Sequence, residues 1–302
     1  MGIKIEEITP VRGVHIKEAT SGDLINIPRK FWQTLLYRHN VIVIDPVSLN
    51  KEQYIHLCCK FGCPWKESLY DLHQEDIGHD GIIKWSDQGE LGKRSLPWHV
   101  DNSWHPRWRH PIRVLYAISI PDSQSGVLHH LDLTTLYGRL PDSEKKWLSG
   151  FKVLIQNFKN QQIRHWYPLV QRNPVTGKKG LNITAMDLDV NIFGLKKEPD
   201  YVSGNTFLLE VCSDQGEKLP LEYLAEYIQK SMELRHCHFF RPWSPGMIQV
   251  ISNLDGVHTR TRISDGLGER LHWRKTMAHD FQAQQDFNGT YTEKINEAED
   301  VR

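Results

Sequence analysis

Two histidines and one aspartate have the residue types and spacing of a metal-binding triad. His99 and Asp101 are separated by one residue in the stretch Trp-His-Val-Asp, and His258 lies far downstream. Because side chains at positions i and i+2 of an extended strand point to the same face, His99 and Asp101 can bind one ion. Two imidazoles and one carboxylate, with the opposite coordination positions open, are typical of non-haem Fe(II) oxygenases.

The surroundings of His258 support this interpretation, although an HxD pattern alone is weak in a chain with 16 histidines. The apolar run Met247–Ile251 predicts a buried strand just before His258. Arg270 and Arg274 follow it, and guanidinium groups suit the binding of carboxylates. The same three ligands can also bind Zn²⁺, so a zinc hydrolase is an alternative, but the sequence has no HExxH motif in its favour.

Four short segments also match the motifs of a known family in order and spacing. They are the WHxD box at Trp98–Asp101, a central hairpin at Leu169–Ile183, a W-x-P-G turn at Trp243–Gly246, and the strand end Ser252–His258. From about residue 41 to about residue 275, the sequence resembles the taurine dioxygenase (TauD/TfdA) family of Fe(II)- and 2-oxoglutarate-dependent dioxygenases.

The resemblance implies a reaction and a role for each of four residues. His99, Asp101 and His258 would bind Fe(II), and 2-oxoglutarate and dioxygen would take the open positions. Arg270 matches the arginine that pairs with the distal carboxylate of 2-oxoglutarate, which suits the planar fork of a guanidinium. The expected reaction is hydroxylation or desaturation of a C–H bond, with release of succinate and CO2. Halogenation is disfavoured, because halogenating relatives replace the carboxylate ligand by a small residue.

One segment departs from the family pattern. The family's G-G-D-T, whose threonine helps to hold 2-oxoglutarate, stands here as Ser125-Gly126-Val127-Leu128. Neither of the last two side chains can donate a hydrogen bond. We therefore expect that Arg270 and a nearby group such as His129 bind the cosubstrate. The alternative is a non-catalytic or altered-cosubstrate protein that binds a small molecule on the same fold.

Five residues are candidates for the substrate pocket. Arg274 matches an arginine that meets the anionic group of the substrate in the taurine enzyme. The family topology adds four more by position: Glu67, Tyr70, Asn102 and Trp104. Glu67 together with Arg274 would suit a zwitterion, such as an amino acid, or a natural-product intermediate. For the aromatic residues, packing in the core or in a lid is the alternative.

The pattern of the chain predicts a mainly β fold with flanking helices. Short apolar strand candidates recur between amphipathic segments, and the longest is Ile112–Ile120. Helices are predicted at residues 28–40, 49–61, 132–140, 142–151 and 220–235. The resemblance implies a double-stranded β-helix, a jelly roll of the cupin-like kind. We expect a single domain over residues 1–302, with a mobile loop at 63–97 and a frayed C-terminal tail.

Composition excludes several classes of partner. Lys+Arg and Asp+Glu both number 37, so no overall charge attracts nucleic acid or an anionic membrane. No apolar run approaches the roughly 20 residues of a membrane span, and no secretory signal is visible. The five cysteines show no CxxC pair, which favours free thiols and a cytoplasmic location. The expected partner is a small-molecule substrate, and the resemblance allows a homo-oligomer.

Overall fold

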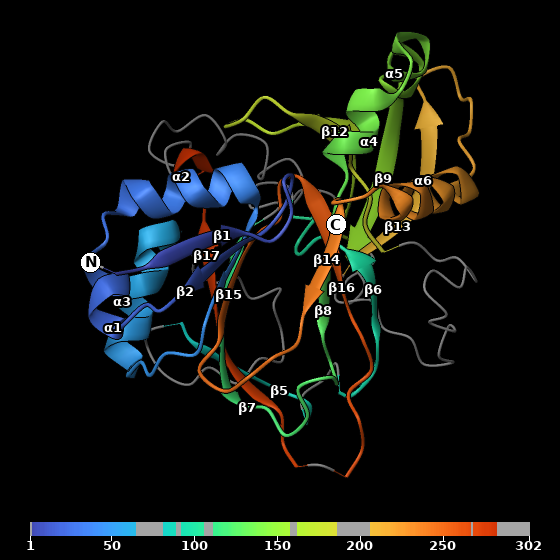
Figure 1. Cartoon of the computed structure of the whole chain (residues 1–302). Coiled ribbons are helices and arrows are strands. Elements are labelled where there is room, and N and C mark those ends of the chain that lie inside the picture. Colours follow the sequence, from blue (N-terminus) through green and yellow to red (C-terminus); the bar gives the residue numbers. More distant parts are fainter. Residues whose placement is uncertain are drawn as a thin grey trace, which may run out of the picture.

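Two β-sheets face each other in the computed structural model, which describes residues 2–64, 81–88, 92–105, 111–157, 162–185, 206–266 and 268–282. The larger sheet has the order β1-β2-β3-β15-β7-β17-β4, with β5 also paired to β17 (Figure 1). Its strands are β1 (Lys4–Glu7), β2 (Val14–Lys17), β3 (Val41–Ile44), β4 (Cys63–Pro64), β5 (Ile83–Ser86), β7 (Ile112–Ser119), β15 (Ile248–Ser252) and β17 (Leu271–Ala278).

The second sheet has four strands and the order β14-β8-β16-β6. Its strands are β6 (Leu96–His99), β8 (Leu128–Asp132), β14 (His238–Arg241) and β16 (Gly256–Arg260). Two smaller sheets are formed by β9 (Phe151–Asn157), β10 (Arg164–Pro168) and β13 (Thr206–Ser213), and by β11 (Val170–Arg172) and β12 (Lys179–Leu181). The helices are α1 (Ser21–Asn26), α2 (Arg29–His39), α3 (Lys51–Phe61), α4 (Thr134–Arg139), α5 (Asp142–Leu148) and α6 (Leu221–Glu233).

Helices α1, α2 and α3 cover the outer face of the larger sheet (Figure 1). Alternation along β7 divides its side chains between the two faces. Val114 and Tyr116 pack outward in one cluster with Trp32 and Leu57 of the helices. Leu115 packs inward in another cluster, together with residues of the four-stranded sheet such as Leu128 and Phe239. The space between the sheets is therefore filled by inward side chains from both.

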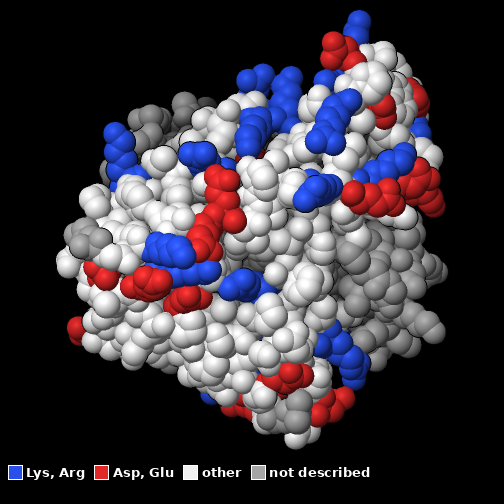
Figure 2. Space-filling model, in the orientation of Figure 1, with Lys and Arg blue, Asp and Glu red and all other residues white. Residues whose placement is uncertain are grey.

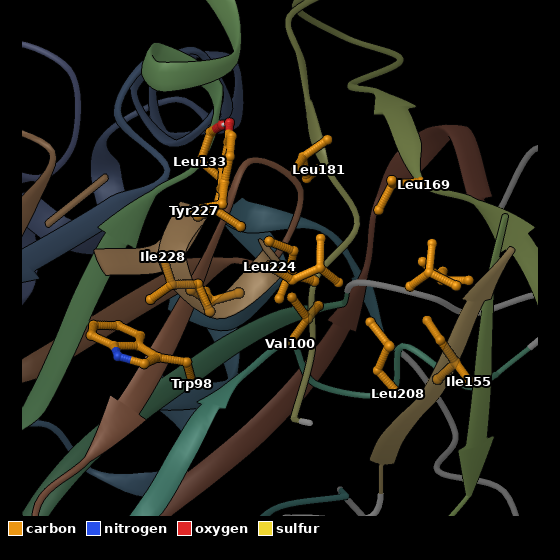
Figure 3. Packing of buried hydrophobic residues seen from close by; sticks show 14 of the residues in the cluster. Trp98, Val100, Leu133, Ile155, Leu169, Leu181, Leu208, Leu224, Tyr227 and Ile228 are labelled. Atoms are coloured by element: carbon orange, nitrogen blue, oxygen red, sulfur yellow. Dashed lines mark hydrogen bonds between the residues drawn. The ribbon is translucent and has the colours of Figure 1, made fainter. Parts of the chain in front are cut away.

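The outer face of the four-stranded sheet is covered by α6 and by the sheet of β9 and β13. Figure 3 shows Trp98 and Val100 among Tyr227 and Ile228 of α6 and the strand residues Ile155 and Leu208. Trp98 and Val100 are two residues apart and point into this cluster, so the intervening His99 points to the interior between the sheets. Because the apolar face of α6 packs on the Trp98 side of β6, the metal ligands can lie only on the opposite side of this strand.

Local sequence signals explain several boundaries. α3 begins after Asn50, whose side chain accepts a hydrogen bond from the Gln53 backbone, and the Gln53 side chain accepts one from the Asn50 backbone in return. α2 ends at Asn40, which adopts a left-handed conformation with a φ of 62°. Asp132 was expected to begin a helix, but it closes β8, and its carboxylate accepts from the Thr135 backbone at 2.8 Å.

The main expectation of a mainly β jelly roll with flanking helices is confirmed. The predicted strand at 112–120 corresponds to β7, and the predicted helix at 220–235 to α6. The predicted helix at 142–151 is too long, because α5 ends at Leu148 and Phe151 begins β9. The stretch 63–97 contains β4, β5 and the start of β6, and the rest of the expected loop falls partly outside the described residues.

The remaining expectations concern thiols, membranes and charge. All five cysteines are free thiols, as predicted. In the described part of the chain, no helix is long and apolar enough to cross a membrane. Figure 2 shows acidic and basic side chains interspersed on the face in view, in line with the equal numbers of the two kinds in the sequence. The single domain over the whole chain and the frayed tail stay predictions.

Candidate metal centre

The pairing of β6 with β16 brings His99 and His258 together. They are direct partners in the register of this antiparallel pair, and their ring centroids lie 4.3 Å apart. Asp101 follows the end of β6 on the same side, and one ligand atom from each of the three residues lies within 4.8 Å of the others. The structure therefore brings the three predicted metal ligands into one group.

Hydrogen bonding orients the His99 ring toward the carboxylate. Nδ1 of His99 lies 2.8 Å from the backbone oxygen of Pro97, and a carbonyl can only accept, so Nδ1 carries the proton. The lone pair is then on Nε2, which lies 4.0 Å from Oδ1 of Asp101. Nε2 of His258 lies 3.7 Å from Oδ2 of the same carboxylate. A fixed tautomer of this kind is typical of a metal-ligating histidine.

Burial and nearby charges set the protonation states of His258 and Asp101. Burial, with the charge of His99, lowers the pKa of His258 to about 3, so its imidazole is neutral at neutral pH. Burial alone would raise the pKa of Asp101, but Arg113 and the two histidines outweigh it and hold that pKa below its usual range. A neutral imidazole and an ionised carboxylate are donors that a divalent cation binds.

Two residues that sequence reasoning missed hold the Asp101 carboxylate. The side-chain amide of Asn253 donates to Oδ2 at 3.2 Å and to the backbone oxygen of Pro111 at 2.7 Å. Nε of Arg113 forms an ion pair with the same Oδ2 at 3.4 Å. Asn253 was noted only as part of a motif. The signal for Arg113 was a charged residue in the apolar run that predicts β7.

Arg270 lies between the sheets with nitrogens that face no protein partner. Its side chain is buried, and Nε and Nη2 have no hydrogen-bond partner among the described residues. Its guanidinium lies 5.8 Å from the ring centroids of both Trp85 and Trp243. Burial and the neighbouring Arg260 lower the pKa of Arg270 to about 9, against the effect of Asp87. A buried guanidinium with unused donors fits the binding of a carboxylate.

The segment that departs from the family pattern packs directly on Arg270. Gly126 has a φ of 63°, and a Cβ atom there would lie 2.7 Å from Nη1 of Arg270, so this position requires glycine. Leu128 is buried in the apolar cluster between the sheets and pairs with Arg260 in the β8–β16 register. The side chain at the family's threonine position therefore adds apolar surface and no hydrogen bond.

The structure does not bring His129 to the predicted cosubstrate site. His130 is the partner of His258 in the β8–β16 register, so the neighbouring His129 points to the opposite face of β8. There, Nδ1 of His129 lies 3.0 Å from Nε2 of His238, and its ring stacks on Phe240. His129 therefore lies on the face of β8 that is turned away from the proposed cosubstrate site. The histidine that does face the interior is His130, whose Nε2 lies 3.2 Å from the side-chain oxygen of Gln249.

The predicted substrate residues fall into three groups. Arg274 is buried on the inner face of β17 opposite Leu115, and its charge helps to lower the pKa of Asp101. Asn102 is buried beside the ligand Asp101 and accepts from Nη2 of Arg113 at 3.4 Å. Trp104 lies in the outer hydrophobic cluster, which favours the packing alternative. Glu67 and Tyr70 lie outside the described residues.

Two further arginines, Arg260 and Arg262, differ in their exposure to solvent. Arg260 is buried, and its Nη2 donates to the backbone oxygens of Gly92 and Arg94 at 2.8 and 2.6 Å. Its role is to fasten the segment before β6. Arg262 is exposed and pairs with Asp265 at 3.4 Å. Of these two arginines, only Arg262 is exposed to solvent.

Comparisons with known proteins agree with this geometry. Residues 4–277 match the family described as "Taurine catabolism dioxygenase TauD, TfdA family". A taurine dioxygenase from Burkholderia xenovorans has a similar structure, with a TM-score of 0.67, 18% identity and coverage of 92% of this chain and 90% of that one. The structure of AAD-2 in complex with Mn(II) and N-oxalylglycine is also similar, with a TM-score of 0.64, 15% identity and coverage of 92% and 98%.

No curated protein matches the sequence. The family match nevertheless spans most of the chain and includes the three grouped ligands and Arg270. The chain belongs to the TauD/TfdA family of Fe(II)- and 2-oxoglutarate-dependent dioxygenases.

Proposed function

We propose that this protein oxidises a C–H bond of a small molecule, with 2-oxoglutarate as cosubstrate and release of succinate and CO2. The observation that supports it most is the combination of the His99, Asp101 and His258 group with a buried Arg270 whose Nε and Nη2 have no partner among the described residues. Fe(II), 2-oxoglutarate and dioxygen would supply the oxidising power at this site. His99, Asp101 and His258 would hold the metal, and Arg270 would bind the distal carboxylate of 2-oxoglutarate.

The protein's own contribution is to orient these groups and to exclude water. The Pro97 carbonyl fixes the His99 ring, and Asn253 fixes the Asp101 carboxylate. The walls around Arg270 are the rings of Trp85 and Trp243, which keep the dielectric low and strengthen a guanidinium–carboxylate pair. Because Leu128 provides no hydrogen bond, Arg270 carries the binding of the distal carboxylate with less help than the family pattern gives.

For the substrate, we propose an anionic group bound by Arg274. Its side chain points into the space between the sheets, as those of the metal ligands do, and its charge lies near enough to Asp101 to lower the pKa of that residue. With Glu67 as a partner for an ammonium group, the substrate would be a zwitterion such as an amino acid. The apparent affinity for the true substrate should then fall in both Glu67→Gln and Arg274→Ala, and unchanged affinities in both would rule this substrate class out.

The test of the reaction class is an anaerobic titration of the Fe(II)-loaded protein with 2-oxoglutarate. A weak visible charge-transfer band that saturates is expected for chelation of the cosubstrate at an open triad, and it should be absent in His99→Ala. Turnover of 2-oxoglutarate to succinate, measured in air without substrate, then checks the activity. Bound iron without a band would contradict the proposal.

The second candidate is a non-catalytic or altered-cosubstrate binding protein. It is favoured by one observation, the apolar Leu128 at the position where the family has a threonine. It predicts that iron binds, that the band is missing, and that 2-oxoglutarate does not stabilise the protein against heat. A homo-oligomer and a cytoplasmic location stay predictions under either candidate.

A further inference from the structure

Arg113 is a buried cation in an apolar strand and has no part in the function proposed above. It lies in β7 between Ile112 and Val114, both fully buried. A buried arginine is costly for a fold unless its charge and its donors are matched. Its position on the inner face of the larger sheet, where Leu115 also lies, directs it toward the metal ligands.

The guanidinium of Arg113 touches three different parts of the site. Nε forms the ion pair with Oδ2 of Asp101 at 3.4 Å. Nη2 donates to the side-chain oxygen of Asn102 at 3.4 Å, and Nη1 donates to the hydroxyl of Thr276 in β17. One planar group thus joins the Asp101 carboxylate, the residue after it and β17, the strand that neighbours β7 in the larger sheet.

The carboxylate of Asp101 is restrained from two sides as a result. Asn253 donates to Oδ2 at 3.2 Å from the loop between β15 and β16, and Arg113 reaches the same oxygen from β7. Asp101 lies two residues beyond His99, the last residue of β6, and its backbone N–H donates to Oδ1 of Asn253 at 3.4 Å instead of to a neighbouring strand. We propose that Arg113 is a positioning residue for the proposed metal site: its fork fixes the orientation in which the Asp101 carboxylate meets a divalent cation.

Charge and geometry make opposite predictions for this residue. A cation near a metal site repels the metal, so charge alone predicts that removal of Arg113 strengthens metal binding. If Arg113 instead acts by orienting Asp101, loss of its planar guanidinium should weaken metal binding, because the groups that hold a metal ligand support the metal affinity of the site. Arg113→Lys separates the two effects, since lysine keeps the charge but cannot contact three groups with one planar fork.

The experiment is a calorimetric titration of the metal-free full-length protein with Co(II) alone. Arg113→Lys should bind Co(II) about 10- to 100-fold more weakly than the wild type. The visible Co(II) spectrum should change as well, because the carboxylate meets the metal differently. Thr276→Val removes one anchor of the fork and should weaken binding less, in the same direction. The exposed Arg262→Lys is the matched control and should bind as the wild type does.

A second arm tests whether Arg113 acts through Asp101. In an Asp101→Ala background, which keeps the two imidazoles, Arg113→Lys should leave Co(II) affinity unchanged, since the group it orients is gone. A purely structural role would weaken binding in both backgrounds. Equal affinity of Arg113→Lys and the wild type, or an equal loss in both backgrounds, overturns the inference. If Arg113→Lys does not fold, the Co(II) affinity of Thr276→Val is compared in the wild-type and Asp101→Ala backgrounds in its place.

The inference rests on the proposed function, and the titration distinguishes the two failures. A wild-type protein that binds no Co(II) contradicts the metal site itself and this inference with it. A wild-type protein that binds Co(II), with Arg113→Lys binding equally well, contradicts only the role of Arg113.

Discussion

The two ends of the proposed active site satisfy their polar groups in different ways. At the metal end, the protein itself supplies partners, because the Asp101 carboxylate contacts Asn253 and Arg113 and the His99 ring is held by a backbone carbonyl. At the other end, Arg270 is buried between two indole rings with Nε and Nη2 unused by the described residues. The contacts around Asp101 and His99 are already formed within the protein, whereas the Arg270 end would be completed by the carboxylate that we propose it binds.

This difference has an energetic consequence. A buried charge without a partner destabilises a fold, and a ligand carboxylate that pairs with it recovers part of that free energy. We therefore expect substitutions at the metal end to abolish the chemistry, and substitutions at Arg270 to change cosubstrate affinity and protein stability.

His99→Ala should reduce turnover of 2-oxoglutarate to background. The substitution removes one of three proposed metal ligands, and the interior His130 cannot replace it because its ring is already paired with Gln249. Succinate release is the measurement. His56→Ala, on the exposed face of α3, is the matched control and should retain the wild-type rate. Full activity in His99→Ala would show that the metal ligands are assigned wrongly.

Arg270→Lys should raise the apparent KM for 2-oxoglutarate roughly 10- to 100-fold, with a smaller change in kcat. Lysine keeps the charge but loses the bidentate geometry, and a hydrogen bond to a charged group contributes about 1.5–3 kcal/mol. The measurement is succinate release as a function of 2-oxoglutarate concentration. Arg262→Lys on the exposed loop is the control. A fall in kcat at unchanged KM would contradict the assignment of Arg270 to cosubstrate binding.

Arg270→Met should stabilise the protein in the absence of ligands, by about 1 kcal/mol net. Removal of a buried charge with two unpaired donors is favourable, and the lost interactions with the two indole rings and with the Asp87 carboxylate offset part of the gain. Denaturant unfolding with and without 2-oxoglutarate is the measurement, and the stabilisation by 2-oxoglutarate should disappear in the variant. If the metal-free variant is instead less stable, Arg270 has a structural partner and the contrast between the two ends fails.

The three residues grouped at the metal end could be predicted from the sequence, whereas the residues around Arg270 could be predicted only in part. The HxD pattern works because i and i+2 side chains share a face, and His258 follows from the apolar run that forms β15. Arg113 was missed because its role depends on the β7–β17 register and on a contact between sheets, neither of which a local pattern encodes. His129 was wrongly favoured because the side of β8 that faces the interior was not known before the pairing with β16.

The smallest effect is expected at His129 on the outer face of β8. Substitution of this residue also serves as a control for the residues between the sheets. Burial, with the charge of His238, lowers the pKa of His129 to about 4, well below its value in an unfolded chain. The unfolded state therefore binds protons more readily, so the stability contributed by a neutral His129 is present above about pH 6.5 and is lost as the pH falls toward 4. His129→Gln should lessen the loss of stability between pH 7 and pH 4.5 and leave the KM for 2-oxoglutarate unchanged. Unfolding at the two pH values, with His56→Gln as the exposed control, is the measurement. A raised KM would return His129 to the cosubstrate site and contradict the assignment of the two faces of β8.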